Sequence, residues 1–422
     1  LATEGGFKGE ISAGASRFDP AEAGFSVRGG SDHFGYFTTG ATSRSDRFLD
    51  PVNFENLHNH GATGRLFNRF DWILSDQDTL RASISGGRTS RDVANLASQE
   101  LRGQDQRVAT SDANLSLAWT HLFGATRSLD ASLYYRHAAA DLDPTADMEP
   151  GFTGSGPDYP VWVRQHRTLD NQGAQIAFTQ RFPGDSTLKA GLQYVAFPIQ
   201  ERFRFAITED SLAPDGPMHA YTPAGGGHIF DFNGKIKPVL ASAFAQGDVH
   251  LGAWFLALGL RYDHYTVEDI TQAQLQPRIG LSYRVAATGT VLRASYDRLL
   301  VTRENENLAL SLSQQAWDLG PYHGTPRAPL RPELQDSYSY GVEQQIGKRV
   351  RFTLEYWEKQ SWNAGDNEQF LNTGVLFPIA AARGLFHGMN ARLDVVPLAG
   401  FSAYLSLGKT RAIFQAPTVG GL

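Results

Sequence analysis

Residues 254–263 read Trp-Phe-Leu-Ala-Leu-Gly-Leu-Arg-Tyr-Asp, and their side chains alternate between two kinds. Every even position from Trp254 to Tyr262 holds a leucine or a large aromatic residue. The odd positions hold Phe255 and then small or charged residues, which end with Arg261 and Asp263. Successive side chains of a β-strand point to opposite faces, so this period of two predicts a strand with one apolar face.

The same alternation recurs along the chain, for example at 114–120, 129–136, 278–285 and 292–297. Several of these runs exceed the usual strand of about 5–6 residues. They are long enough for a tilted membrane crossing, which takes about 9–11 residues. We therefore expect an all-β fold, an antiparallel transmembrane β-barrel with its apolar face against lipid and its polar face against a wet lumen.

The connections between the runs alternate in length, which supports a membrane barrel over a soluble sandwich. Short turns are expected at 29–32, 75–78, 124–126, 183–186, near Asp248, and at 287–289, 347–349 and 398–400. Long polar stretches lie at 45–62, 94–110, 141–166, 208–233, 300–335 and 363–385, and brief connections lie near 18–23 and 268–275. Short periplasmic turns and long external loops are typical of outer-membrane barrels.

The composition excludes several other classes of protein. The chain has 422 residues, a formal net charge of −6 and no cysteine, so it has no disulfide, thiolate nucleophile or cysteine-bound metal. Charged residues make up 19% of the chain and form no strongly basic run, which argues against nucleic acid as a partner. The longest apolar run, near Trp254, is far shorter than the roughly 20 residues of a membrane-spanning helix.

The runs predict about 17 strands, whereas bacterial single-chain barrels have even numbers of strands. We therefore expect residues 1–422 to be one incomplete barrel domain that lacks its last strands. Residues 416–422 are expected to begin another loop.

Several stretches resemble strands of TonB-dependent outer-membrane receptors. Residues 275–284, Leu-Gln-Pro-Arg-Ile-Gly-Leu-Ser-Tyr-Arg, resemble the family's "xPRxGLxY" strand, and 288–296 continue it. Leu330-Arg331-Pro332-Glu333 with 337–343 is similar to the family's "L-x-PE…YE-x-G-x-E" strand. Further similar stretches are 191–194, 259–263, 305–308, 370–374 and 383–385.

The resemblance covers most of the chain and is closest to the large receptors with a carboxypeptidase-like N-terminal extension. It implies a barrel of 22 strands, cut short at both ends, because no TonB box, plug domain or terminal aromatic signature is found. It also implies a monomeric barrel in the lipid of a Gram-negative outer membrane. Such a barrel takes up a scarce ligand (a siderophore, cobalamin or an oligosaccharide) with energy from the TonB complex, and the TonB complex would act through the missing N-terminal region.

No catalytic motif is present, so we expect no enzyme and no cofactor. His58-Asn59-His60 and Asp141, Asp143 and Asp147 are better explained as solvated loops than as metal sites, because they lack a full ligand set. The candidates for ligand contact in external loops are Trp162, Trp317, Tyr322, Trp362, Glu304 and Asn305. The candidates for the lumen wall are Arg261, Asp263, Arg278, Arg284, Arg293 and Asp297.

Three alternatives stay open at this point. A passive porin of 16 or 18 strands would need an inward constriction loop with opposed basic and acidic rows. An outer-membrane barrel enzyme would need a Ser/His/Asp cluster at one rim. A soluble secreted β protein would need polar residues where Trp254, Leu256 and Leu258 stand.

Overall fold

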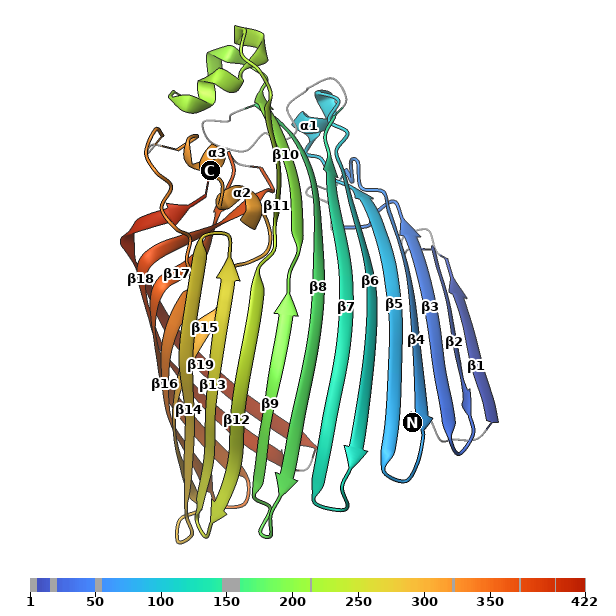
Figure 1. The fold of residues 1–422 in the computed structure, drawn as a ribbon, viewed down its shortest axis with the longest axis vertical. Coiled ribbons are helices and arrows are strands. Elements are labelled where there is room, and N and C mark those ends of the chain that lie inside the picture. Colours follow the sequence, from blue (N-terminus) through green and yellow to red (C-terminus); the bar gives the residue numbers. More distant parts are fainter. Residues whose placement is uncertain are drawn as a thin grey trace.

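The computed structural model describes residues 6–15, 21–49, 55–145, 160–212, 215–320, 323–371, 373–398 and 400–421. These residues form one antiparallel sheet of 19 strands, which curls so that its C-terminal strands pass behind its middle strands (Figure 1). The strands are β1 (Gly6–Gly14), β2 (Ala21–Gly30), β3 (Phe34–Ser45), β4 (Gly61–Ile73), β5 (Asp78–Asp92), β6 (Arg107–Leu122), β7 (Arg127–Asp143), β8 (Val161–Arg181), β9 (Thr187–Ala196), β10 (Ile199–Ile207), β11 (Phe230–Ile236), β12 (Val239–Leu251), β13 (Trp254–Val267), β14 (Ile270–Val285), β15 (Thr290–Val301), β16 (Glu333–Ile346), β17 (Val350–Gln369), β18 (Leu376–Leu398) and β19 (Phe401–Gly420).

Helical segments are short and lie in connections. They are α1 (Ala97–Leu101), α2 (Leu308–Ser311), α3 (Gln314–Trp317), η1 (Asp210–Leu212), η2 (Pro217–Tyr221) and η3 (Pro223–Gly225). No helix in the described ranges is long and apolar enough to span a membrane.

Two strands of the barrel wall are each interrupted: β9 and β10 together form one of them, and β11 and β12 together form the other. The upper half of β8 pairs with β10 and its lower half with β9, while β10 pairs with β11 and β9 with β12. The breaks fall at Pro198 and Pro238, whose ring nitrogens cannot donate to the ladder. Counting each broken pair as one, the 19 strands make 17 wall strands, which confirms the predicted number.

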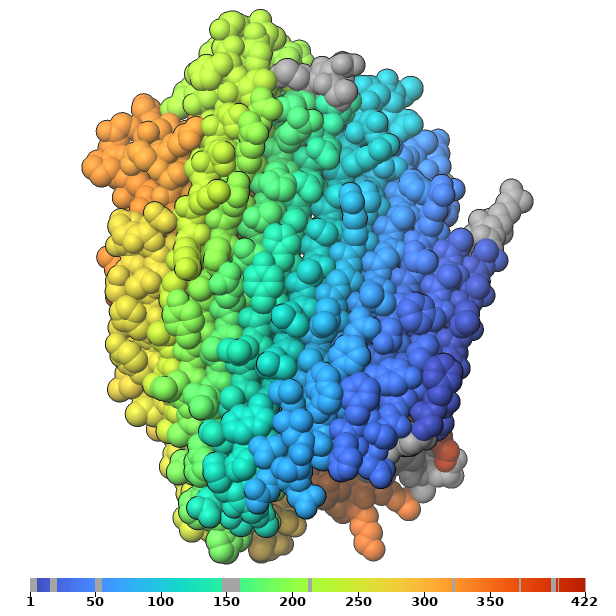
Figure 2. Space-filling view, turned by 45° about the vertical axis from the view of Figure 1, so that its right-hand side comes forward, coloured from blue at the N-terminus to red at the C-terminus, as the bar shows by residue number. Residues whose placement is uncertain are grey.

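The register confirms the predicted alternation of faces. Trp254 lies opposite Tyr283, Tyr283 opposite Leu292, and Leu292 opposite Val342, so all four side chains share one face. This outward face carries large exposed apolar residues, which we call the apolar belt: Leu115, Leu117, Leu133, Ile176, Leu192, Leu258, Leu260, Ile279 and Leu292. Figure 2 shows the outward surface of the part coloured blue to green, where side chains from neighbouring strands lie in contact with one another.

The lengths of most connections agree with the prediction, with three corrections. Residues 363–385 were expected to be a long loop, but β17 runs to Gln369 and β18 begins at Leu376, so strands take up most of this range. Residues 416–420 were expected to begin a loop, but they belong to β19 and pair with β18. The turn expected near Asp248 lies instead at Gly252, whose φ of +61° suits glycine.

In the described part of the chain, β1 pairs only with β2 and β19 only with β18, so these two edge strands are not joined. The buried core lies at the end of the sheet that carries the long connections. Inward side chains of β8, β10, β11 and β13 pack there against α2 and against the ends of β17 and β18, and the core includes Val163, Phe203, Phe205, Phe230, Tyr265, Leu308, Leu310, Phe370 and Phe377.

Candidate functional site

The inward face of the sheet is polar. Arg278 lies opposite Gly259 on β13 and opposite Asp297 on β15, so Arg278 and Asp297 share one face. Arg261 and Asp263 follow Gly259 at steps of two on the same face. Arg293 lies opposite Ser282, and Arg284 is two positions along from Ser282. The six residues predicted for the lumen wall therefore share the face opposite the apolar belt.

Part of this inward face is a hydrogen-bonded network. The Arg261 guanidinium donates to Asp263 at 2.7 Å, to Ser242 at 2.7 Å and to Gln193 at 3.0 Å. Gln276 donates to the other oxygen of Asp263 at 2.5 Å and accepts the backbone N–H of Leu300 at 3.1 Å. Because these groups satisfy one another, Arg261 and Asp263 stiffen the wall and are not free to bind a ligand.

The connection between β15 and β16 folds inward at the loop end of the sheet and packs against β10, β11 and β18. We call residues 302–320 and 323–332 the cap; it contains α2 and α3, which Figure 1 shows at the same end as β10 and β11. Leu308, Ala309, Leu310 and Leu312 are all buried against the inward face of the wall. Burial of this apolar surface is what holds the cap in place.

Glu201 of β10 anchors the cap. Its carboxylate accepts the backbone N–H of Leu310 at 2.9 Å, and the side chain is 1% exposed. The outward neighbours Arg202 and Arg204 both pair with Asp231, so this part of the wall lies beyond the apolar belt. Burial raises the pKa of Glu201 to about 7, although the N–H groups of α2 and the charge of Arg167 oppose that rise.

Arg303 holds the stem of the cap and is 4% exposed. Its Nε donates to the carbonyl of Arg331 at 2.7 Å, and its Nη2 donates to the carbonyl of Asn363. Glu333, at the start of β16, accepts the N–H of Gly365 at 3.0 Å. These bonds tie the ends of β15 and β16 to β17, so both ends of the cap are fixed.

The residues predicted for external ligand contact do not converge on one place. Trp162 lies on the outward face of β8, where its Nε1 donates to Thr145 at 3.2 Å and its ring lies 5.7 Å from both Arg164 and Arg204. Trp362 is 38% exposed on the outward face of β17.

The remaining members of that set belong to the cap. Trp317 lies in α3 and donates to Thr325 at 3.1 Å. Glu304 and Asn305 lie near the start of the cap, whereas Tyr322 lies outside the described residues. Contact of these residues with a ligand stays a prediction.

Sequence reasoning missed a hollow on the inward face of β4–β8. It has a volume of about 400 Å³ and is lined by Arg65, Asp112, Arg136, Arg167 and the cap residues Asn305 and Glu306. A second hollow of about 440 Å³ shares Arg65, Asp112 and Arg136 with the first. We call the two together the arginine hollow. The signal in the sequence was an arginine at an inward position in three strands, but no motif joins them.

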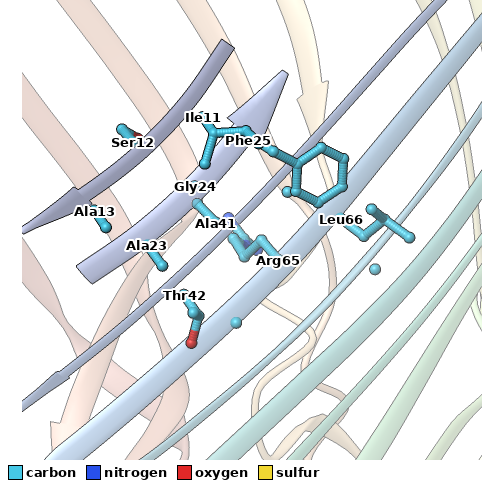
Figure 3. Close-up of a pocket in the computed structure, with 13 residues that line it drawn as sticks. Ile11, Ser12, Ala13, Ala23, Gly24, Phe25, Ala41, Thr42, Arg65 and Leu66 are labelled. Atoms are coloured by element: carbon cyan, nitrogen blue, oxygen red, sulfur yellow. The ribbon is translucent and has the colours of Figure 1, made fainter. Parts of the chain in front are cut away.

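A larger hollow of about 770 Å³ lies over β1–β5 and is mainly apolar (Figure 3). Ile11, Phe25 and Leu66 line it, together with glycines and alanines. A methyl group added at Gly40 would lie 2.5 Å from the Phe25 ring, so the glycine lets that ring lie flat against the sheet. These residues belong to the outward face, away from the polar wall.

The two histidines near residue 59 are paired with separate carboxylates. His58 lies 2.9 Å from Asp105, and His60 lies 2.8 Å from Asp46. Across the described ranges, no group of three or more His, Asp or Glu side chains is placed to hold a metal ion. Asp147, one of the three aspartates considered as metal ligands from the sequence, lies outside the described residues.

The family profile described as TonB dependent receptor-like, beta-barrel, matches residues 16–410. The chain belongs to this TonB-dependent receptor family. The assignment confirms the resemblance drawn from the sequence and favours a receptor barrel over the passive porin. That the chain resembles most the large receptors with a carboxypeptidase-like N-terminal extension stays a prediction.

Solved structures show the same fold as this TonB-dependent receptor barrel. The ferric yersiniabactin uptake receptor FyuA from Yersinia pestis matches with a TM-score of 0.68 and 10% identity, over 98% of this chain and 62% of that one. The FrpB iron transporter from Neisseria meningitidis matches with a TM-score of 0.67 and 14% identity, over 98% and 64%. The copper transporter OprC also scores 0.67 with 14% identity, over 98% and 62%.

The receptor barrel thus spans less than two thirds of the length of these structures. No curated protein matches it by sequence. At these identities the structural likeness establishes the fold alone.

Proposed function

We propose that the protein is the barrel of an outer-membrane receptor of a Gram-negative bacterium, and that it takes up a scarce substrate by TonB-coupled transport. Residues 1–422 form one barrel domain in this proposal. Its partners are outer-membrane lipid, the TonB complex and a small or medium-sized ligand, and the barrel is monomeric. It carries out no bond chemistry.

The observation that carries the proposal is the contrast between the two faces of the sheet in a member of this family. Leu258 and Leu260 are 47% and 48% exposed on the outward face, which suits lipid and not water. The inward face at the same level carries Arg261, Asp263 and Arg278, which suit a wet pathway. The cap packs against the inward face at the loop end of that pathway, where an incoming ligand would meet it.

Among the expected substrate classes, siderophore, cobalamin and oligosaccharide, we favour the metal chelates. The structurally similar proteins are named as transporters or receptors of copper, iron, ferric yersiniabactin and ferripyoverdine. The predicted external residues Trp317, Tyr322, Glu304 and Asn305 would meet such a ligand first, whereas Trp162 and Trp362 face outward, away from the pathway.

Uptake in cells tests the proposal. A strain that carries the gene, its deletion mutant and the complemented mutant are supplied with ⁵⁵Fe-labelled siderophores, labelled cobalamin and labelled oligosaccharides. We expect one of these to accumulate only when the gene is present, and accumulation to stop when a protonophore collapses the inner-membrane gradient. Gene-dependent entry that is unchanged by the protonophore, or by loss of TonB, would show a passive pore and contradict the proposal.

A further inference from the structure

The arginine hollow lies directly under the cap. Arg65 comes from β4, Arg136 from β7 and Arg167 from β8, and all three point to the inward face. Asn305 and Glu306 of the cap complete the lining of the upper part. The hollow therefore has one wall that is fixed in the sheet and one that belongs to the cap.

The three arginines are in different states. Arg65 pairs with Asp112 of the neighbouring wall at 2.8 Å, and Arg167 pairs with Glu306 of the cap. Arg136 has neither a hydrogen bond nor an ion pair within the described ranges, and it is exposed to the hollow. Its cross-strand neighbours Asn114 and Asn171 are uncharged. The hollow thus holds one uncommitted guanidinium and one that is held only by the cap.

We propose that the arginine hollow binds a carboxylate group of the substrate, with Arg136 as its first partner and Arg167 as its second. A guanidinium presents paired N–H donors that match the two oxygens of a carboxylate. Arg167 pairs with Glu306 in this structure. Because Glu306 is itself a carboxylate, an anionic ligand would replace a carboxylate of the cap at Arg167. Uncharged and cationic substrates gain nothing at this place.

The exchange at Arg167 couples binding to the cap. Arg167 and Glu306 are 27% and 46% exposed, and an ion pair this open to water is weak enough for an incoming anion to displace. When the ligand takes Arg167, the cap loses its Glu306 contact. Gln165 of β8 still binds Asn307, so the cap stays anchored one residue further along.

The test is titration of the purified protein in detergent with tricarballylate, a tricarboxylate, at low ionic strength and pH 7. Its triamide is the uncharged control of the same shape. We expect tricarballylate to bind and the triamide not to bind. R136Q should weaken binding at least about tenfold, because it removes a charge-assisted contact. E306Q should tighten binding about threefold or more, because it removes the internal competitor.

Matched variants distinguish this site from general lumen charge. R278Q removes an exposed inward arginine of β14, and D318N removes a cap carboxylate that does not line the hollow. Both should bind tricarballylate like the unmodified protein, and the far-ultraviolet β spectrum should be the same for every variant. Absence of tricarballylate binding, equal loss in R278Q and R136Q, or no gain in E306Q would each overturn the inference.

The inference rests on the proposed function only in calling the bound anion part of a substrate. Binding to the purified protein needs no energy source, so it is measured independently of uptake. Energised uptake without tricarballylate binding would contradict this inference and leave the proposed function standing. Tricarballylate binding that depends on Arg136, without energised uptake, would contradict the proposed function and leave this inference standing.

Discussion

The attachment of the cap should weaken as the pH rises, because a buried carboxyl group anchors it. Glu201 has a pKa of about 7 in the closed structure, where burial disfavours its charged form. When the cap opens, the side chain meets water and its pKa returns towards the ordinary 4.5. Between these values the closed state holds a proton that the open state has released, so closure is strongest at low pH and is lost progressively as the pH rises through this window.

The two pKa values set the size of the effect. Going from pH 5 to pH 8, the equilibrium between closed and open cap should shift by up to about 70-fold, or about 2.5 kcal/mol, towards the open form. Amide hydrogen exchange of 308–312, corrected for the intrinsic change of exchange rate with pH, measures this equilibrium. We expect the corrected protection of these amides to fall between pH 5 and pH 8.

The variant E201Q tests the reasoning. Glutamine is uncharged at every pH, and its carbonyl oxygen still accepts the N–H of Leu310 in place of the carboxylate. Its cap should therefore show no pH dependence and should be better protected than that of the unmodified protein at pH 8. Equal protection at both pH values in the unmodified protein, or the same fall in E201Q, would refute the account of Glu201.

Three further predictions concern stability. R303M leaves the carbonyls of Arg331 and Asn363 without their buried donor and should cost about 3–5 kcal/mol, seen as rapid proteolysis of the cap, whereas R331M, at an exposed position, should not. G191A places a methyl group 2.4 Å from the backbone oxygen of Ile176 and should lower the free energy of unfolding by about 1–3 kcal/mol in a urea titration, whereas G259A, with 3.5 Å of room, should cost less. L258R, on the apolar belt, should lower the free energy of unfolding in lipid vesicles by about 2–4 kcal/mol, and equal loss in the inward control A257R would contradict the assignment of faces.

The strands and their two faces could be predicted because strand geometry forces a period of two on any sheet with one apolar face. The even positions from Trp254 to Tyr262 fix the outward face of β13 without any knowledge of its neighbours. The turns at 75–78 and 183–186 were equally visible, since their Gly, Pro, Asp and Ser residues favour tight reversals.

The cap and its anchors could not be predicted, because they depend on contacts between distant parts of the chain. One signal was present: the large apolar residues of β13 move from even positions, up to Tyr262, to odd ones at Tyr265 and Val267. The same switch separates Leu192 of β9 from Phe203 of β10. It marks the level at which the outward apolar belt ends and the inward core begins. Only the structure shows which segment covers that core, and that Glu201 and Arg303 are buried.

The most direct test of the account is the environment of each position along 256–261 in intact outer membranes. The chain has no cysteine, so single cysteines can be placed at these positions in turn without removing any other. We expect a water-soluble maleimide to label positions 257, 259 and 261, and a lipid-soluble reagent to label 256, 258 and 260. Labelling without this period of two, or labelling of Leu258→Cys by the water-soluble reagent, would contradict a barrel wall between lipid and a wet pathway.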